Sequence, residues 1–196
     1  MGTLGERAIA RGEKVWLRAF TEDDLTSYMK AVNDAEVAFL AGYVGPANEA
    51  SVRSFYEKYI VGRHGDEYFL VISPLESDDF IGTCWLWNFD SRIGGPEYSI
   101  YLSEPGRWGK GVGTDATNAM LDLGFGFREI NRVWLYTDAS NPRSRRSFEK
   151  SGFQVEGTAR KNVIRRGAYT DSVVMSILRE EWDALDRPKS WDYLED

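Results

Sequence analysis

Three glycines stand at alternate positions at the mouth of a helix, and this stretch constrains the fold more than any other. RWGKGVGTDATNAM spans residues 107–120 and contains Gly109, Gly111 and Gly113. A glycine inside a helix costs about 1 kcal/mol relative to alanine, so something must need bare backbone there. The strand-like stretch EYSIYL, at 97–102, comes just before. The pattern therefore predicts a strand, a glycine loop and the first turn of a helix in direct succession.

Such a loop is suited to binding phosphate. The first turn of a helix has unpaired N–H donors and a partial positive charge, and glycines let a phosphate approach the backbone. The spacing is not that of a Walker A loop, because no Gly-Lys-Ser/Thr follows at the required distance. It also differs from the GxGxxG pattern of dinucleotide-binding folds. Taken alone, the loop fits either a phosphate site or simple turn chemistry.

Hydrophobic periodicity predicts an α/β (mixed α+β) chain with the order βααβββαβαββ. Strands are expected at 14–20, 67–72, 80–89, 97–102 and 132–139, and in a hairpin from 153 to 178 that turns at Arg166–Gly167. Helices are expected over Leu25 to Val32, 48–62 and 112–127, and from Asn141–Pro142 to a stop at Gly152. Thr21 and Asp24 form a helix-capping box. Helices placed among strands in this way favour a mixed sheet of about seven strands covered on both faces.

Length and composition indicate one soluble domain. The chain has 196 residues, of which 42% are hydrophobic and 28% charged, as in ordinary globular proteins. We expect a loose arm at 1–13 and a single domain at 14–196. No apolar run approaches the roughly 20 residues that span a bilayer, and the N-terminus lacks a signal-peptide core. We therefore expect a cytoplasmic chain without membrane contact.

Single cysteine and histidine residues argue against metal chemistry. Cys84 is the only cysteine and lies in a strand-like stretch, where a buried thiol is favoured over a nucleophile. His64, the only histidine, follows the expected helix end at Gly62. A zinc site would have to be built from carboxylates alone, so we expect no metal.

Charge is distributed unevenly along the chain. Residues 143–166 contain eight basic and two acidic residues, a net charge of +6. The whole chain has a net charge of −7, so the rest of the chain has a net charge of −13. The basic residues are Arg143, Arg145, Arg146, Lys150, Arg160, Lys161, Arg165 and Arg166. They indicate either a solvated helix face with a hairpin rim or an anion pocket in an otherwise acidic protein that attracts cations. The overall acidity disfavours nucleic acid as a partner.

Three stretches together resemble the GNAT superfamily of acyl-CoA-dependent N-acetyltransferases, over roughly positions 14–182. They are EYSIYLSEPGRWGKGVGTDA, NRVWLYTDASNPRSRRSFEKSGFQVEGTAR and GAYTDSVVMSIL followed by REEW. The branch that it resembles most includes the Rim-type acetylases of ribosomal protein N-termini and the spermidine acetyltransferases. The resemblance implies a GNAT-like fold, with a central mixed, mostly antiparallel sheet of about seven strands, and acetyl-CoA as co-substrate.

It also implies a cofactor site. The family's [Q/R]xxGxG pattern, which cradles the CoA diphosphate, matches Trp108, Gly109, Lys110, Gly111, Val112 and Gly113, with Thr114 opening the helix. Trp108 replaces the usual Gln or Arg, and we expect little effect because this position contributes mainly backbone. The family's splayed strand, whose backbone pairs with pantetheine, matches Ile100, Tyr101 and Leu102. Its NxxS motif matches Asn141 and Ser144. Arg143 and Arg146 are either phosphate partners or solvated helix residues.

The resemblance suggests catalytic groups too. Glu97 is the candidate general base, with a structural role at the sheet end as the alternative. A backbone N–H near Leu102 would hold the oxyanion. Phe148 stands where many family members have a tyrosine that protonates the leaving thiolate. Ser144 is left as the candidate proton donor, directly or through water.

Three functions stay open at this point. The first is an N-acetyltransferase that acts by direct transfer on a primary amine, with a protein N-terminal α-amine favoured over a polyamine or drug. The second is an acyl-CoA-binding regulator that has lost turnover, which Phe148 favours. The third is an interaction protein whose glycines are only turns. A homodimer is left open.

Overall fold

A computed structural model describes residues 8–42, 46–62, 67–89 and 94–193. Within them one sheet of eight strands has the order β1-β2-β3-β4-β5-β6-β8-β7. All neighbours are antiparallel except β5 and β6. The strands are β1 Ala10–Arg11, β2 Val15–Ala19, β3 Tyr68–Pro74, β4 Gly82–Trp87, β5 Glu97–Leu102, β6 Arg132–Asp138, β7 Gln154–Arg165 and β8 Ala168–Leu178. The expected mixed, mostly antiparallel sheet is confirmed.

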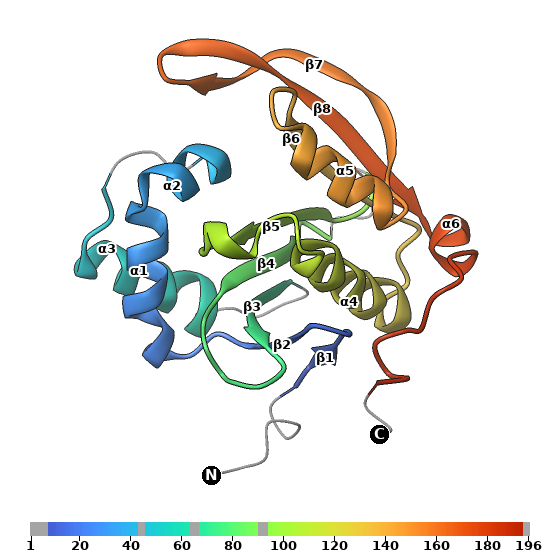
Figure 1. Ribbon diagram of the computed structural model, residues 1–196, viewed down its shortest axis with the longest axis horizontal. Helices are drawn as coiled ribbons and strands as arrows, with labels where there is room; N and C mark the ends of the chain where they lie inside the picture. Colours follow the sequence, from blue (N-terminus) through green and yellow to red (C-terminus); the bar gives the residue numbers. More distant parts are fainter. Residues whose placement is uncertain (1–7, 43–45, 63–66, 90–93, 194–196) are drawn as a thin grey trace.

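Helices cover both faces of the sheet, also as expected (Figure 1). They are α1 Leu25–Asn33, α2 Ala35–Ala41, α3 Glu49–Tyr56, α4 Val112–Phe127, α5 Pro142–Lys150 and α6 Arg179–Asp183. The larger core, on the side of α4 and α5, includes Leu17, Ile72, Leu86, Tyr98, Met120, Leu135, Phe148 and Met175. The smaller core, on the side of α1 and α3, contains Phe20, Tyr28, Val32, Val52 and Val71. The sheet is therefore the wall between two separate cores.

The side chains of β5 point alternately to the two faces of the sheet, and this decides which of them reach the larger core and which the smaller one. Tyr98 is buried in the larger core, and Ile100 and Leu102 pack against it. Tyr101 packs against the smaller core, while Ser99 is exposed. Successive side chains of a strand point to opposite faces, which is the alternation that the sequence predicts for 97–102. Glu97 therefore shares its face with Ser99 and Tyr101.

The parallel neighbours β5 and β6 are paired at one position only, Glu97 opposite Trp134. Beyond it, β5 remains paired with β4 as far as Leu102. The Ser103 N–H donates to the Ile81 carbonyl at 2.9 Å, so the backbone of residue 103 faces β4. Because alternate residues of an antiparallel pair direct their N–H and C=O groups to opposite sides, Ile100 and Leu102 direct theirs toward β6. The sheet thus opens along the second half of β5.

Several boundaries differ from the expectations. Ala10–Arg11 pair with β2, so the expected loose arm at 1–13 contains a strand, and the sheet has eight strands rather than about seven; residues 1–7 lie outside the described residues. The stretch 35–41 forms α2, which the periodicity did not reveal because the helix has only seven residues. Its N-terminus is capped by Asp34, whose carboxylate accepts from two backbone N–H groups. The capping box of Thr21 and Asp24 is confirmed.

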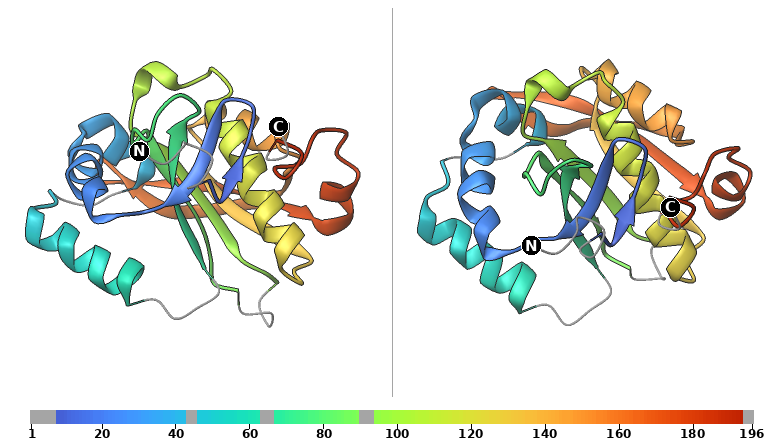
Figure 2. Two further views of the ribbon diagram at one scale, coloured as in Figure 1. Left: turned by 90° about the horizontal axis from the view of Figure 1, so that it is seen from below. Right: turned by 60° about the horizontal axis from the view of Figure 1, so that its bottom comes forward.

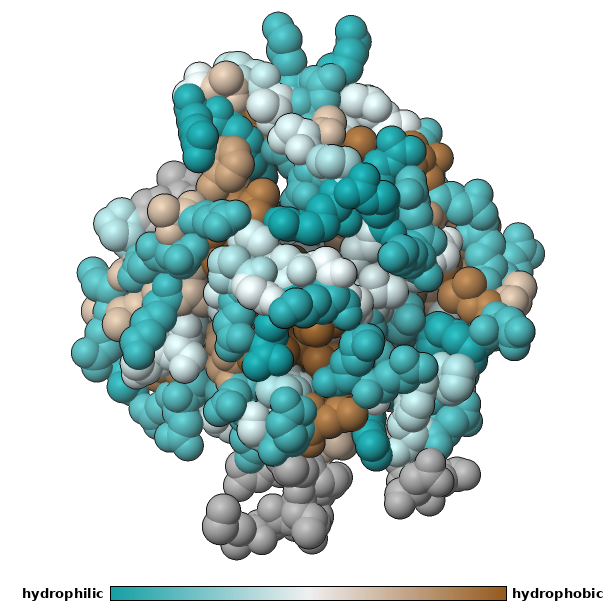
Figure 3. Space-filling view, viewed as in Figure 1, coloured by the Kyte–Doolittle hydropathy of each residue, from teal (hydrophilic) through white to brown (hydrophobic). Residues whose placement is uncertain are grey.

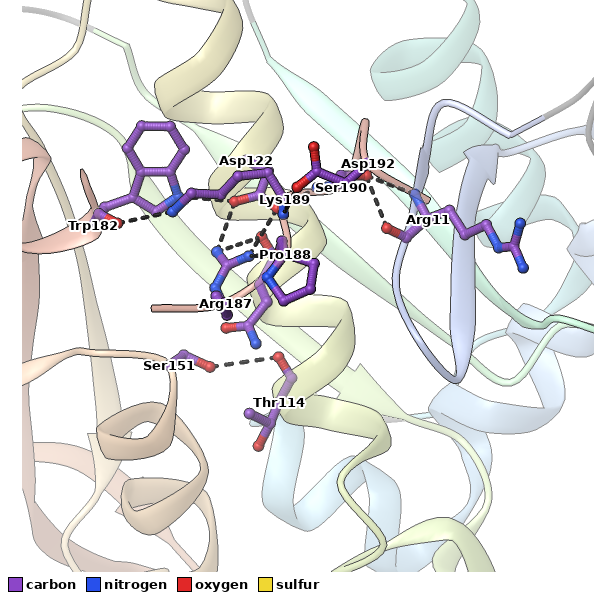
Figure 4. Close-up of polar contacts among 11 residues, drawn as sticks. Arg11, Thr114, Asp122, Ser151, Trp182, Arg187, Pro188, Lys189, Ser190 and Asp192 are labelled. Carbon is purple, nitrogen blue, oxygen red and sulfur yellow. Dashed lines mark hydrogen bonds and ion pairs between the residues drawn. The ribbon is translucent and has the colours of Figure 1, made fainter. Parts of the chain in front are cut away.

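Asp122, in the middle of α4, holds the C-terminal segment against the domain (Figure 4). Its carboxylate is 1% exposed and accepts hydrogen bonds from the Trp182 indole at 2.8 Å and the Ser190 amide at 2.8 Å. The Arg187 guanidinium donates to both of its oxygens, at 2.9 and 2.6 Å. The Ser190 hydroxyl in turn donates to the Arg11 carbonyl of β1. Figure 2 shows β1, α4 and the C-terminal segment side by side.

Hydrophilic residues dominate the face of the molecule shown in Figure 3, with hydrophobic ones in small separate patches. Among the described residues, no helix has the length and apolarity to cross a membrane.

Candidate functional site

The glycine loop joins β5 to α4 in the predicted way. Gly109 and Gly111 have φ of 74° and 84°, a left-handed conformation that glycine adopts without strain, and Gly111 is the residue that caps α4. Gly113 lies in the first turn of α4 and has no such φ. A Cβ at Gly109 would meet nothing within 4 Å, and one at Gly113 would make only ordinary contacts. A Cβ at Gly111 would lie 3.3 Å from the end of the Lys14 side chain, so apart from this side chain the space around the loop is open.

A cavity of about 430 Å³ lies in front of this loop and reaches the opened half of β5. It is lined by Val37, Leu40, Ala41, Ile100, Tyr101, Leu102, Trp108, Gly109, Gly111, Gly113, Thr114, Asn141, Arg143, Ser144, Arg146, Ser147, Phe148 and Lys150. We call it the cleft. It brings together ten of the residues assigned from the sequence to cofactor binding. Lys110 and Val112 are the exceptions: neither lines the cleft, and Val112 is buried in the larger core.

Trp108 contributes its side chain as well as its backbone, which corrects the expectation for this position. Its indole N–H donates to the Leu102 carbonyl at 3.2 Å. Its ring lies under the Arg143 guanidinium, whose central carbon is 4.4 Å from the ring centroid. Trp108 thus ties together the end of β5, the glycine loop and the first turn of α5. It also positions one arginine at the cleft.

Replacing Trp108 by alanine is expected to weaken acetyl-CoA binding about tenfold. The hydrogen bond and the cation–π contact each contribute on the order of 1 kcal/mol, and both hold groups that line the cleft. Trp108→Phe keeps a ring under Arg143 but loses the indole N–H. Its acetyl-CoA affinity should therefore lie between those of the wild type and of Trp108→Ala. Titration calorimetry measures both variants. Wild-type affinity in Trp108→Ala would contradict this role.

The basic segment 143–166 divides into two parts with different surroundings. Arg143, Arg146 and Lys150 line the cleft from α5. The hairpin residues instead reach other partners: Arg165 forms an ion pair with Asp138 at 3.3 Å, and Arg166 lies over the Phe39 ring of α2 at 4.6 Å. The anion-pocket interpretation therefore fits the helical part, and the rim interpretation fits the hairpin.

The start of α5 places the NxxS residues beside Phe148. The Asn141 side chain accepts from the Ser144 amide at 3.1 Å, so this asparagine caps α5. Ser144 and Phe148 both line the cleft. Phe148 is 5% exposed and packs edge-on against Tyr98. An apolar ring thus occupies the place expected for a tyrosine acid, and Ser144 is one of the hydroxyls that line the same cleft.

Glu97 lies at the opposite end of β5 from the glycine loop. It does not line the cleft, and it lies three positions along the strand, or about 10 Å, from Ile100. It is partly buried, and this burial raises the pKa of its carboxyl above the ordinary 4.5. A raised pKa makes the carboxylate a stronger base. Among the described residues its side chain has no hydrogen bond or ion pair.

Two features of the cleft were missed from the sequence. The α2 residues Val37, Leu40 and Ala41 form one wall, and no local pattern indicates that this short helix reaches β5. Ser147 lies opposite Thr114, with their hydroxyl oxygens 2.9 Å apart, and so joins α5 to the first turn of α4. The spacing of Ser144 and Ser147 along α5 could have indicated that both face the same side.

The remaining candidate residues play no part in the cleft. Cys84 is a buried free thiol, as predicted, and burial raises its pKa. His64 lies outside the described residues. The part of the chain that the structure describes holds no group of three His, Cys, Asp or Glu side chains arranged for a metal ion.

Comparison with known families decides the identity of this arrangement. Residues 14–154 match the model of the acetyltransferase (GNAT) domain, well over half of the chain. The chain belongs to the GNAT acetyltransferase family. GNAT acetyltransferases use acetyl-CoA as co-substrate. The open glycine cradle and the arginines from α5 fit the diphosphate of that molecule, and the unpaired side of β5 fits its amide-containing arm.

Relatives of this GNAT chain include several bacterial N-acetyltransferases. An uncharacterized N-acetyltransferase p20 of Bacillus licheniformis is 23% identical over 83% of this chain and 85% of its own length. A spermidine N(1)-acetyltransferase of Escherichia coli is 29% identical over 44% of this chain and 46% of its own. A putative ribosomal N-acetyltransferase YdaF of Bacillus subtilis is 36% identical over 38% of this chain and 41% of its own length.

Solved structures support the GNAT fold. The spermidine N-acetyltransferase of Vibrio cholerae, in complex with CoA and spermine, matches 86% of this chain and 97% of its own with a TM-score of 0.76 and 23% identity. An acetyltransferase of the GNAT family from Bacillus anthracis matches 87% of this chain and 98% of its own, with a TM-score of 0.73 and 20% identity. At these identities the likeness concerns the fold.

Proposed function

We propose that this acetyltransferase transfers the acetyl group directly to a primary α-amine, such as a protein N-terminus, in a ternary complex. The observation that carries the proposal is the cleft itself, which joins the glycine loop to the unpaired side of β5 and ends at α2. One reactant can enter from the loop and the other from the face of Glu97 and Tyr101. Holding both reactants in one place supplies much of the rate enhancement.

The reaction is a nucleophilic acyl substitution. The neutral amine nitrogen attacks the thioester carbonyl carbon, a C–N bond forms and the C–S bond breaks. The Leu102 N–H faces the opened side of β5, where it can donate to the developing oxyanion. The amine proton leaves through water, and Glu97 serves through that water as the general base for amines that are protonated at neutral pH. The leaving thiolate takes a proton from Ser144, which regains it from water.

The distribution of charge supports an α-amine over a polyamine. An α-amine has a pKa of about 7.7 to 8.0, whereas a lysine-like amine near 10.4 needs about 3.4 kcal/mol more to lose its proton. Among the described residues, the Glu97 carboxylate of β5 has no ion pair. Two other acids on the neighbouring strands are neutralised, since Asp138 pairs with Arg165 and Glu156 pairs with Arg132. A chain with one available base suits the more acidic amine.

Glu97→Gln is therefore expected to affect two acceptors differently. The variant should lose little kcat/KM with an N-terminal peptide, but on the order of 100-fold with a polyamine such as spermidine, whose amine needs a general base. Initial rates of thiol release at saturating acetyl-CoA measure both. Equal losses with both acceptors would contradict the proposed role of the amine's own pKa.

The main alternative is a regulator that binds acyl-CoA without efficient turnover, and Phe148 is the observation that favours it. Thiol release with a panel of peptides, polyamines and small amines separates the two. Acetyl-CoA binding without amine-dependent thiol release would support the regulator. Fast turnover of polyamines but not of any N-terminal peptide would overturn the α-amine proposal and leave the acetyltransferase intact.

A further inference from the structure

Two tryptophans flank Glu97 on one face of the sheet. In the register of the sheet, Trp87 of β4 and Trp134 of β6 are the direct neighbours of Glu97 on either side. Directly opposed residues share a face and lie about 4.5–5.5 Å apart at Cβ. The Glu97 side chain therefore stands between two indoles.

Further aromatic rings extend this arrangement along both neighbouring strands. Trp85 lies 5.5 Å from Trp87 between ring centroids, and Tyr136 lies 5.0 Å from Trp134. We call Trp85, Trp87, Trp134 and Tyr136 the aromatic patch. The Trp134 indole N–H donates to the Gly95 carbonyl at 3.1 Å, which fixes the orientation of that ring. The patch is thus a preorganised surface.

This surface is accessible, unlike the other face of the same strands. Tyr136 is 45% exposed, Ser99 is exposed, and Trp87 and Trp134 are partly buried. Trp85 packs against Phe69 and Tyr59, so it supports the patch from its inner end. On the opposite face, Leu86, Tyr98 and Leu135 are fully or almost fully buried in the larger core. Large aromatic side chains kept at a surface in this way mark a contact site more often than a packing requirement.

The patch is connected to the cleft along β5. Tyr101 lines the cleft and lies on the same face as Glu97, with the exposed Ser99 between them. An acceptor whose amine reaches the opened half of β5 therefore has its neighbouring atoms over the patch. The rings offer it apolar area, and Glu97 offers one negative charge.

We propose that the acceptor is a monocationic primary amine with an aromatic or apolar group beside the nitrogen, and that this group lies on the aromatic patch. The inference rests on the proposed function and adds the class of amine. Aromatic side chains contribute large apolar area and stack on flat groups, whereas an extended polyamine brings several charges to a patch that surrounds the single carboxylate of Glu97.

Matched acceptors and variants test this inference. Peptides that differ only in an N-terminal Phe, Leu or Ser are compared with phenethylamine and spermidine, both by thiol release and by calorimetric binding in the presence of CoA. We expect the Phe peptide to exceed the Ser peptide at least tenfold in kcat/KM and in affinity, and phenethylamine, whose amine is lysine-like, to exceed the Ser peptide in affinity. Comparing the Phe peptide with phenethylamine shows whether the preferred acceptor is a peptide terminus or a small free amine.

The variants are Trp87→Ala and Trp134→Ala, with Trp87→Phe and Trp134→Phe where the alanine variants do not fold. Each alanine variant should remove most of the aromatic preference through a higher KM, and leave kcat and the Ser peptide nearly unchanged. Phe127→Ala, an exposed ring at the end of α4 and outside the patch, is the control.

The outcomes separate this inference from the proposed function. Equal binding of the Phe and Ser peptides, or a preference that survives in both alanine variants, would overturn the inference. Aromatic preference in binding without thiol release from any amine would uphold the patch and overturn the transferase proposal.

Discussion

A Gly113→Ala variant is expected to fold normally and to lose acetyl-CoA affinity 10- to 150-fold. Its new Cβ would lie 3.7 Å from Ser147 Oγ and 3.9 Å from Leu102 Cδ1, ordinary contacts that require no movement. The methyl group would instead project into the cleft, where a phosphate has to approach the backbone. Loss of one hydrogen bond to a charged group costs about 1.5–3 kcal/mol, which corresponds to this range. Calorimetric titration gives the affinity.

The same variant should have an unchanged or slightly higher melting temperature without ligand, because alanine favours the helix over glycine. Lost affinity together with a retained melting temperature would show that Gly113 serves phosphate binding. Replacing a glycine with a purely structural role would lower the stability of the protein instead. Gly106→Ala is the matched control: a Cβ there meets nothing within 4 Å, and the residue does not line the cleft. Full affinity in Gly113→Ala would remove the loop from the cofactor site.

Asp122→Ala is expected to destabilise the protein by about 3–5 kcal/mol, since it breaks a largely buried ion pair and leaves the partly buried Arg187 without its partner. The variant also leaves the Trp182 indole and the Ser190 amide without the acceptor that they share. Urea denaturation measures the free energy of unfolding. Hydrogen exchange should rise first in residues 182–193, because these are the residues that Asp122 holds against α4.

Two further variants give this prediction its scale. Arg187→Ala should cost less, because Asp122 keeps its bonds to Trp182 and Ser190. Asp183→Ala removes an exposed carboxylate from the neighbouring α6 and should change stability by no more than about 0.5 kcal/mol. A loss below 1 kcal/mol in Asp122→Ala would show that the C-terminal segment is held by other contacts.

Most of the local structure could be predicted from the sequence because it depends on neighbours in the chain. The cap at Asn141–Pro142, the box at Thr21 and Asp24 and the alternation of β5 are set by residues within a few positions. The glycine loop belongs to the same class, since its positive φ values and its place before α4 follow from residues 107–114. Homodimer formation and the catalytic roles of Glu97 and Ser144 stay predictions.

Long-range contacts were decided only by the tertiary structure. Asp122 meets Arg187 across 65 positions, and α2 reaches the cleft although its seven residues carry no distinctive period. Trp108 holds Arg143, a contact that no spacing in the chain implies. Glu97 stands between Trp87 and Trp134 because β4, β5 and β6 adopt one particular register. Sequence by itself determined the loop that suits a diphosphate. Strand pairing depends on the energy of the whole sheet, and it decided which side chains surround Glu97.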